Sequence, residues 1–177
     1  MGRKPILLEF CKKCGTVLAI DVRPSQISTL VSDLKGEDCH VKEYPFSQRD
    51  CLLERLTEIL SENLKEPGAS PYGIVGVSIG IYGVVQNNRI IFTPYYPLPQ
   101  ENLGELLEQK FKIPVIVENE SNLSVLGESA FHYQYENMIH LNIHDGIGMG
   151  ILIGEQLYKG KDGYAGEFGD TIVFPDG

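Results

Sequence analysis

Carboxylate and amide side chains stand at the ends of two apolar runs in this sequence. Asp21 lies near the end of the run 17–22, and the pair Asn119-Glu120 follows the run 114–118. A planar amide or a carboxylate can hydrogen-bond neighbouring hydroxyl groups, as sugar recognition requires, and a carboxylate can also accept a proton. Asn119 would equally suit the N-terminal cap of a helix, because a helical pattern begins there. These residues are the first candidates for ligand binding or acid–base chemistry.

Four cysteines raise the question of a metal site, and their spacing argues against one. Cys11 and Cys14 have the spacing of half a zinc site, but Cys39 and Cys51 lie far apart and supply no second close pair. We therefore expect neither a metal nor another cofactor, with zinc at Cys11 and Cys14 as the minor alternative. We expect all four cysteines to be reduced thiols of a cytoplasmic protein.

The charge and hydropathy of the chain limit its partners. Its 177 residues are 42% hydrophobic and 22% charged, as in a globular protein, and no apolar run approaches the ~20 residues that span a bilayer. The net charge is −9. A surface that binds DNA should be basic, because affinity comes largely from neutralising phosphates. We expect a cytoplasmic protein with no membrane contact and no DNA-binding surface within these residues.

The pattern of apolar residues predicts the elements that must position the candidate side chains. The expected strands are 17–22, 27–33, 41–46, 74–81, 89–92, 114–118, 138–143, 147–153 and 171–174. The expected helices are 51–64, 103–111 and 119–130. A strand meander, then alternating helices and strands, then a second meander predicts an α/β protein with two related lobes.

Four motifs carry a resemblance to a known family. They are Ala19–Val22, Gly76–Pro94 (GVSIGIYGVV followed by RIIFTP), Pro114–Glu128 (PVIVENESN…LGE) and Gly146–Gly169 (GIGMGI…LYKG…GYAGEFG). In this order and spacing they resemble the ROK family, which groups repressors, open reading frames and sugar kinases. Each glycine-rich piece alone would be weak evidence, whereas four in register are specific.

The resemblance covers residues 5–177 and implies an actin-like, ribonuclease-H-like fold of the ATPase type, with a sugar site in the cleft between two lobes. It implies one full N-terminal lobe, residues 15–118, and the start of a second, incomplete lobe, residues 119–177. Residues 1–14 resemble the linker that follows the winged helix-turn-helix of the family's regulators. We therefore expect DNA contact only through a domain absent from this chain, and we expect the chain to be a truncated piece.

The first phosphate loop of the family's kinases is not matched. In those kinases a glycine-rich turn follows the first-strand aspartate and cradles the nucleotide phosphates. Here Asp21 is followed by Arg23, whose side chain occupies the place of a glycine, and by Pro24, which has no N–H to donate. The loop looks disabled, although the charge of Arg23 could still attract a phosphate.

The second loop and the catalytic base also depart from the kinase pattern. Asp145 precedes Gly146 and Gly148 where a small hydroxyl residue is usual, and its carboxylate would repel a polyanion. We prefer a tight hairpin between two strands for this segment. The kinases carry an aspartate after the asparagine, whereas here Glu120 follows Asn119, and its extra methylene displaces the carboxylate. Catalysis is not expected, and Glu120 is a degenerate base position.

The sugar-binding residues of the family are matched more closely. The resemblance implies that Asn119 contacts the sugar, that Glu167 contacts the ring near its anomeric carbon, and that Gly83 lies in the loop beside it. Glu120 could still hydrogen-bond a hydroxyl. Asp170 stands where the family has a histidine that contacts sugar and ligates zinc, so zinc is not expected, although Asp170 remains a candidate ligand contact.

Our hypothesis is a sugar-binding effector domain from a ROK-family repressor of carbohydrate-metabolism genes, similar to the xylose repressors, which forms a homodimer and lacks kinase activity. The first alternative is a divergent ATP-dependent hexose kinase of the glucokinase type. The second is a dimerisation platform with no small-molecule ligand, because an incomplete second lobe would leave apolar surface exposed.

Overall fold

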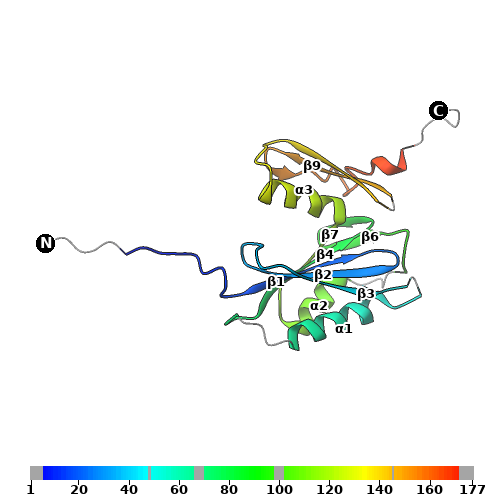
Figure 1. Cartoon of the computed structure of the whole chain (residues 1–177). Coiled ribbons are helices and arrows are strands. Elements are labelled where there is room, and N and C mark those ends of the chain that lie inside the picture. Colours follow the sequence, from blue (N-terminus) through cyan, green and yellow to red (C-terminus); the bar gives the residue numbers. More distant parts are fainter. Residues whose placement is uncertain (1–5, 48, 66–69, 98–101, 145, 172–177) are drawn as a thin grey trace.

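The computed structural model describes residues 6–47, 49–65, 70–97, 102–144 and 146–171 of the chain. In chain order its elements are β1 Thr16–Val22, β2 Gln26–Asp33, β3 His40–Pro45, α1 Leu52–Lys65, β4 Ile74–Ile81, β5 Val84–Gln86, β6 Arg89–Phe92, α2 Leu103–Phe111, β7 Val115–Asn119, α3 Glu120–Phe131, β8 Met138–Ile143, β9 Ile147–Ile153, β10 Gln156–Leu157 and the 3-10 turn η1 Phe168–Asp170. We call β1 to β7 with α1 and α2 the first lobe, and α3 to η1 the second lobe. Figure 1 shows the second lobe stacked on the first.

The first lobe is built on a mixed five-stranded sheet with the order β3-β2-β1-β4-β7. Strands β1, β2 and β3 form an antiparallel meander, and β4 and β7 then join the other edge of β1 in parallel. Parallel neighbours need a crossover, and α1 precedes β4 while α2 precedes β7. The meander followed by alternating helices and strands confirms the sequence-based prediction.

The apolar core lies on the face of this sheet that α1 and α2 cover. Cross-strand partners such as Leu18 with Val77 and Ile20 with Ile79 are all buried there. Leucines and isoleucines at helical spacing complete the core from the helices: Leu52, Leu56, Ile59, Leu60, Leu103 and Leu107. Burial of this face fixes the register of the sheet, because a slip by one residue would turn the apolar set outward.

The opposite face of the sheet carries small and polar residues toward the second lobe. One register row places Ser28, Asp21, Gly80 and Glu118 side by side across four strands. A Cβ atom at Gly80 would lie 3.4 Å from the side chain of Leu123 in α3. The two carboxylates of this row, Asp21 and Glu118, therefore lie on the face of the sheet that is turned toward the second lobe.

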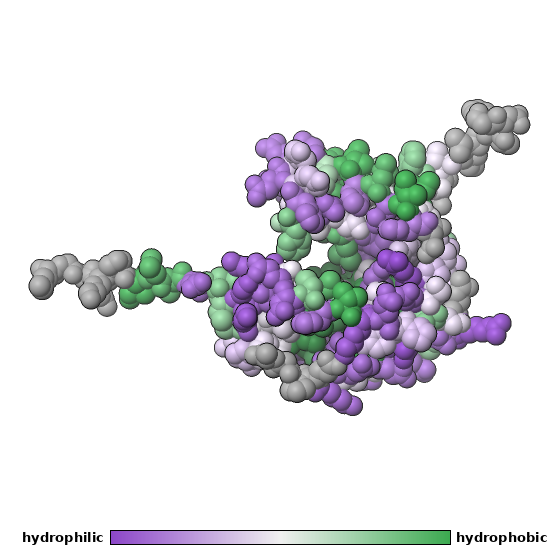
Figure 2. Space-filling view, in the orientation of Figure 1, coloured by the Kyte–Doolittle hydropathy of each residue, from purple (hydrophilic) through white to green (hydrophobic). Residues whose placement is uncertain are grey.

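The second lobe is a three-stranded antiparallel sheet, ordered β10-β9-β8, with α3 packed on one face. The other face is apolar and exposed, and Figure 2 shows apolar residues on the surface of this lobe. Its exposed members are Ile139, Leu141, Ile143, Ile147 and Ile153. Among the described residues no helix covers this face, unlike the corresponding face of the first lobe.

The four cysteines differ in their bonding, and this corrects one expectation from the sequence. Cys11 and Cys14 are joined in a disulfide, so the expectation of reduced thiols is wrong for this pair. A turn closed by the hydrogen bond from the Cys14 amide to the Cys11 carbonyl brings their Cα atoms to 5.5 Å, within the range that a disulfide bridges. Cys39 and Cys51 are free and exposed.

Two further differences concern the second lobe. The short strand β10 was not predicted, because two residues carry no periodic pattern. The strand expected over 171–174 lies outside the described residues except for Thr171, which follows η1 and is not part of a strand. Throughout the described ranges, no helix combines the length and the apolar character needed to cross a membrane.

The core makes a matched comparison of two isoleucines possible. Ile79 in β4 is fully buried, whereas Ile116 in the adjacent strand β7 is 60% exposed. We expect Ile79→Ala to lower the free energy of unfolding by about 2–5 kcal/mol, because it removes buried surface and leaves a cavity. Ile116→Ala should lower the free energy of unfolding by much less than this. Urea unfolding of both variants measures the difference, and equal losses would contradict the assignment of the core face.

Candidate functional site

Strand β7 runs directly into helix α3, and this junction forms one wall of the site. Asn119 is the last residue of β7, and its Oδ1 accepts hydrogen bonds from the amides of Ser121 and Asn122, at 2.9 and 3.0 Å. The predicted N-cap is therefore confirmed. Because Asn119 caps the helix, its neighbour Glu120 begins the first turn of α3 at the cleft between the lobes.

The same asparagine ties the junction to the turn between β4 and β5. Its Nδ2 donates to the carbonyl oxygen of Gly83 at 2.9 Å. Gly83 has a φ of 147°, and a Cβ atom there would overlap the carbonyl oxygen of Phe92. Only glycine fits this position. The turn between β4 and β5, which the resemblance places beside the ligand, is held against Asn119 by this hydrogen bond to the Gly83 carbonyl.

Glu120 is a half-buried carboxylate at the entrance to α3. Its Oε1 accepts a hydrogen bond of 2.6 Å from the hydroxyl of Ser121. Burial raises the pKa of the Glu120 carboxyl above its ordinary value, because desolvation disfavours the charged form. A carboxylate in this state is a strong hydrogen-bond acceptor for a hydroxyl group that replaces the lost water.

Strand β9 approaches the first turn of α3 closely enough to form the opposite wall. A Cβ atom at Gly150 would overlap the carbonyl oxygen of Ser121 and lie 2.7 Å from Val125. Gly148 lies against the side chains of Ser121 and Glu120. The hairpin that contains Gly146 joins β8 to β9, with Ile143 opposite Ile147, as the sequence predicts.

The third part of the site is the segment that follows β10. The amide of Ala165 donates to the carbonyl oxygen of Lys159 at 3.1 Å, which closes a loop and returns the chain to the cleft. The next residues, Gly166 and Glu167, line the cavity, and Glu167 is half-buried. Glu167 of the second lobe thus faces the same cavity as Asn119 and Glu120.

These parts enclose a cavity of about 310 Å³ between the lobes. Amide, carboxylate and imidazole groups line it from both lobes: Asn119, Glu120, Asn142, His144 and Glu167. Aromatic rings line it from the first lobe: Tyr82, Phe92 and Tyr95, of which Tyr82 and Tyr95 pack edge to face. No lysine or arginine is found among the described residues of its lining. Paired acceptors beside aromatic rings suit a neutral polyhydroxyl ligand.

A second cavity adjoins the first and contains the degenerate phosphate loop. Asp21 and Arg23 line it, together with Glu120 and His144, which both cavities share. The Nε of Arg23 donates to Oδ2 of Asp21 at 2.7 Å, so the carboxylate at the end of β1 is already paired with a guanidinium. The turn that follows is a tight hairpin, with the Arg23 amide bonded to the carbonyl oxygen of Gln26 at 2.8 Å.

The predicted site residues thus divide into groups. Gly83, Asn119, Glu120, Gly146, Gly148 and Glu167 meet at one cavity, and Asp21 and Arg23 meet at its neighbour. Asp145 lies outside the described residues, and of Asp170 only the backbone is described, in η1. His144, Asn142 and Tyr82 also line the cavity but were not predicted. The position of Tyr82 directly before Gly83 was the available signal.

No cluster of three or more possible metal ligands occurs within the described part of the chain. The cavity residues are carboxylates, amides and one imidazole without a common centre. The amide and carboxylate groups of the lining can hydrogen-bond to a ligand.

Comparison with known proteins identifies the family that shares this architecture. The model of the ROK family matches residues 17–177. The chain is 33% identical to a xylose repressor of Bacillus spizizenii over 181 residues, an alignment that covers 97% of this chain and 46% of the repressor. It therefore spans about half the length of the curated relatives it matches.

Two solved structures show the same fold. A ROK family glucokinase from Streptomyces griseus, in complex with glucose and AMPPNP, superposes with a TM-score of 0.77 at 27% identity, covering 92% of this chain and 52% of the kinase. A ROK family transcriptional regulator, a homologue of the E. coli MLC protein, gives a TM-score of 0.81 at 24% identity, covering 94% and 43%. The predicted actin-like α/β fold is confirmed.

Two glycines of this region provide a test of the packing that shapes the cavity. We expect Gly150→Ala to destabilise the fold by about 1–3 kcal/mol, because the added methyl group overlaps the Ser121 carbonyl oxygen. Gly127→Ala, in α3 with open space around it, should instead stabilise by about 0.5–1 kcal/mol. Urea unfolding compares the two variants. A Gly150→Ala variant as stable as the parent would contradict the close approach of β9 to α3.

Proposed function

This chain belongs to the ROK family, and from that premise we propose that it is the sugar-binding part of a cytoplasmic transcriptional repressor that controls carbohydrate-metabolism genes. The observation that carries the proposal is the cavity between the lobes, where Asn119 and Glu120 of the β7–α3 junction face the same space as Glu167 of the second lobe. A ligand held by both sides would bias how far the lobes close, and closure is the signal that the repressor would use.

The lining of the cavity favours an unphosphorylated sugar. Glu120 and Glu167 place carboxylates in it, and the described residues of the lining include no lysine or arginine. A sugar phosphate would bring like charge to a partly desolvated site, which costs affinity. A neutral sugar instead offers hydroxyl groups to the carboxylates and apolar ring faces to Tyr82 and Tyr95. The matched relative is named a xylose repressor, so D-xylose is the first ligand to test.

Three observations support a regulator over a kinase. Asp21 is paired with Arg23, so it is less available to a nucleotide-bound cation. The hairpin after β1 contains Pro24 in place of a glycine that could offer an amide. Glu120 stands at the position where the kinases need a shorter aspartate. The likeness to a ROK glucokinase keeps a divergent hexose kinase as the alternative.

DNA recognition is assigned to a separate domain in this proposal. The chain carries a net charge of −9, which opposes binding to phosphates. The extended residues 6–10 leave the first lobe as a projecting arm with exposed Ile6, Leu7 and Leu8 (Figure 1). We propose that this arm, within the linker of residues 1–14, connects the two lobes to the domain that reads DNA.

A thermal-shift measurement tests sugar binding. D-xylose at about 100 times its dissociation constant should stabilise the fold by roughly 2.7 kcal/mol, which raises Tm by about 5–10 °C for a chain of this size. Glu167→Ala should weaken binding by about 10- to 100-fold, because a hydrogen bond to a charged group is lost. Glu136→Ala, an exposed carboxylate of the same lobe, is the matched control and should bind as the parent does.

The same experiment separates the regulator from the kinase. Mg-ATP should leave the xylose-induced shift unchanged, and a coupled assay should detect no sugar-dependent release of ADP. Sugar-dependent ADP release would overturn the regulator proposal in favour of the hexose kinase. A parent protein that none of the common pentoses or hexoses stabilises would remove the sugar-binding claim itself.

The apolar face of the second-lobe sheet favours dimerisation as a second candidate function. Ile139, Leu141 and Ile143 alternate along β8 on the face that no described element covers, and apolar patches of this kind mark interaction surfaces. We propose that a second copy of the chain covers this face, giving a homodimer.

Light scattering during gel filtration tests the dimer. The parent should elute with twice the mass of one chain. Leu141→Lys should shift the equilibrium toward the monomer, because it places a charge in the buried interface. Val41→Lys, at an exposed apolar position of β3 in the first lobe, should leave the mass unchanged. A monomeric parent at concentrations of about 100 μM would contradict the proposal, since stable dimers assemble well below that.

A further inference from the structure

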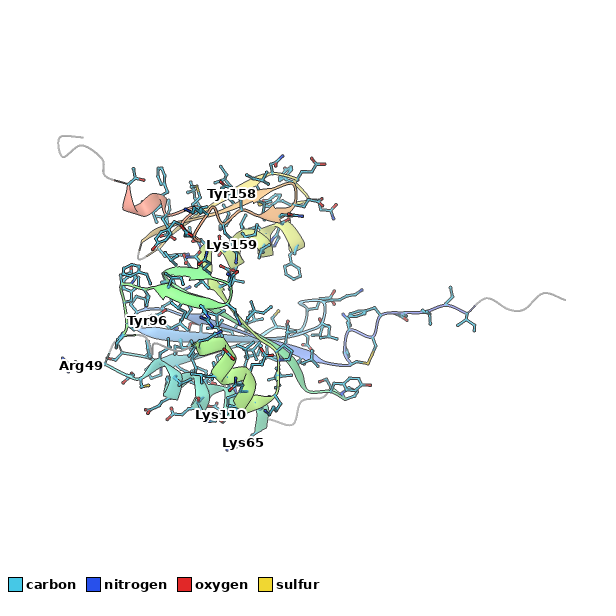
Figure 3. The ribbon with its side chains drawn as sticks, turned by 180° about the vertical axis from the view of Figure 1, so that it is seen from behind. Arg49, Lys65, Tyr96, Lys110, Tyr158 and Lys159 are labelled. Atoms are coloured by element: carbon cyan, nitrogen blue, oxygen red, sulfur yellow. A yellow bond between two sulfur atoms is a disulfide. The ribbon has the colours of Figure 1, made fainter. Side chains whose placement is uncertain are left out.

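An ion pair joins the two lobes beside the cavity. The ammonium group of Lys159, in the loop after β10, donates to Oε2 of Glu118 in β7, across 41 residues of sequence. Figure 3 shows Lys159 between the second lobe and the sheet of the first. The Glu118 side chain is only 9% exposed, so its charge is held largely away from water. A buried carboxylate needs such a partner, because an unpaired charge there is strongly destabilising.

Glu118 is also bound to the junction that carries the site. Its Oε1 accepts from the backbone amide of Asn119 and from the side-chain Nδ2 of Asn122, each at 3.0 Å. One carboxylate therefore holds the last residue of β7, the first turn of α3 and the lysine of the second lobe. Any movement of Glu118 would move Asn119, the helix cap, and with it the orientation of Glu120.

Lys159 stands at the base of the loop that carries Glu167. Its carbonyl oxygen accepts from the amide of Ala165 at 3.1 Å, two residues before Glu167. The amide of the preceding residue, Tyr158, donates to the carbonyl oxygen of Ile151 in β9 at 2.8 Å. The loop is thus anchored to the second-lobe sheet by its backbone and to the first lobe by the side chain of Lys159.

We propose that Lys159 is a positioning residue that sets the separation between Glu167 and the Asn119-Glu120 pair through its ion pair with Glu118. The proposal deepens the sugar-binding function and rests on it for the identity of the ligand. Lys159 touches no ligand, since it does not line the cavity. Its effect is to hold hydrogen-bonding groups from two lobes in one geometry, which saves the sugar the cost of ordering them.

Three single variants test the role of the lysine. Lys159→Met keeps the length of the side chain and removes its charge. It should weaken D-xylose binding, measured by isothermal titration calorimetry, by at least about tenfold. Lys159→Arg keeps the charge and should bind within about threefold of the parent. Lys161→Met, an exposed lysine two residues further in the same loop, is the matched control and should bind as the parent does.

A double variant separates positioning from stability. Lys159→Met leaves Glu118 buried without its cation, and this alone could unfold the chain. Lys159→Met with Glu118→Gln removes both charges and keeps an amide that can hydrogen-bond Asn122, so the fold should be retained. If the pair acts by positioning, the double variant still binds D-xylose at least about tenfold more weakly than the parent. Parent-like affinity in the double variant would overturn the proposal.

Hydrogen–deuterium exchange gives a readout that needs no ligand. Amides of residues 158–167 should exchange at least about tenfold faster in the double variant than in the parent, while those of β4 remain unchanged. Parent-like exchange in this loop would overturn the positioning role. If the parent itself binds no sugar, the sugar-binding function fails, and the exchange rates alone still decide whether Lys159 fixes the loop.

Discussion

The absence of a linker between β7 and α3 is the constraint on which this structure depends. Asn119 ends the strand and Glu120 begins the helix, so the direction of the chain is fixed at a single residue. The side-chain amide of Asn119 contacts both lobes, because its Oδ1 caps helix α3 of the second lobe while its Nδ2 donates to the carbonyl oxygen of Gly83 in the first lobe. A rigid junction places Glu120 at the cleft and sets the direction in which the whole second lobe leaves the first.

The other half of the site follows from how β9 packs on that helix. Gly150 lets the strand lie against the Ser121 carbonyl, which brings the second-lobe sheet and the loop after β10 to the cleft. Lys159 of the second lobe then forms an ion pair with Glu118 of the first lobe, one residue before the junction. The groups that hold the lobes together therefore adjoin the groups that face the cavity.

The elements and the local roles could be predicted from the sequence, whereas the long-range contacts could not. A run rich in β-branched residues predicted β4 as Ile74–Ile81, and the helical pattern predicted α2 as Leu103–Phe111. The position of Asn119 between a strand and a helical pattern predicted the cap. The pairing of Lys159 with Glu118 leaves no local pattern, because 41 residues separate them. The disulfide of Cys11 and Cys14 was missed because its spacing is also compatible with free thiols.

We propose that one sugar is held by both lobes at the β7–α3 junction. A crystal structure of the chain with bound D-xylose tests it most directly. We expect the sugar in the cavity between the lobes, with hydroxyl groups within hydrogen-bonding distance of Glu120 and Glu167 of the second lobe and a ring face toward Tyr82 and Tyr95 of the first. A sugar bound elsewhere, or one that contacts a single lobe and leaves Glu167 unengaged, would contradict it.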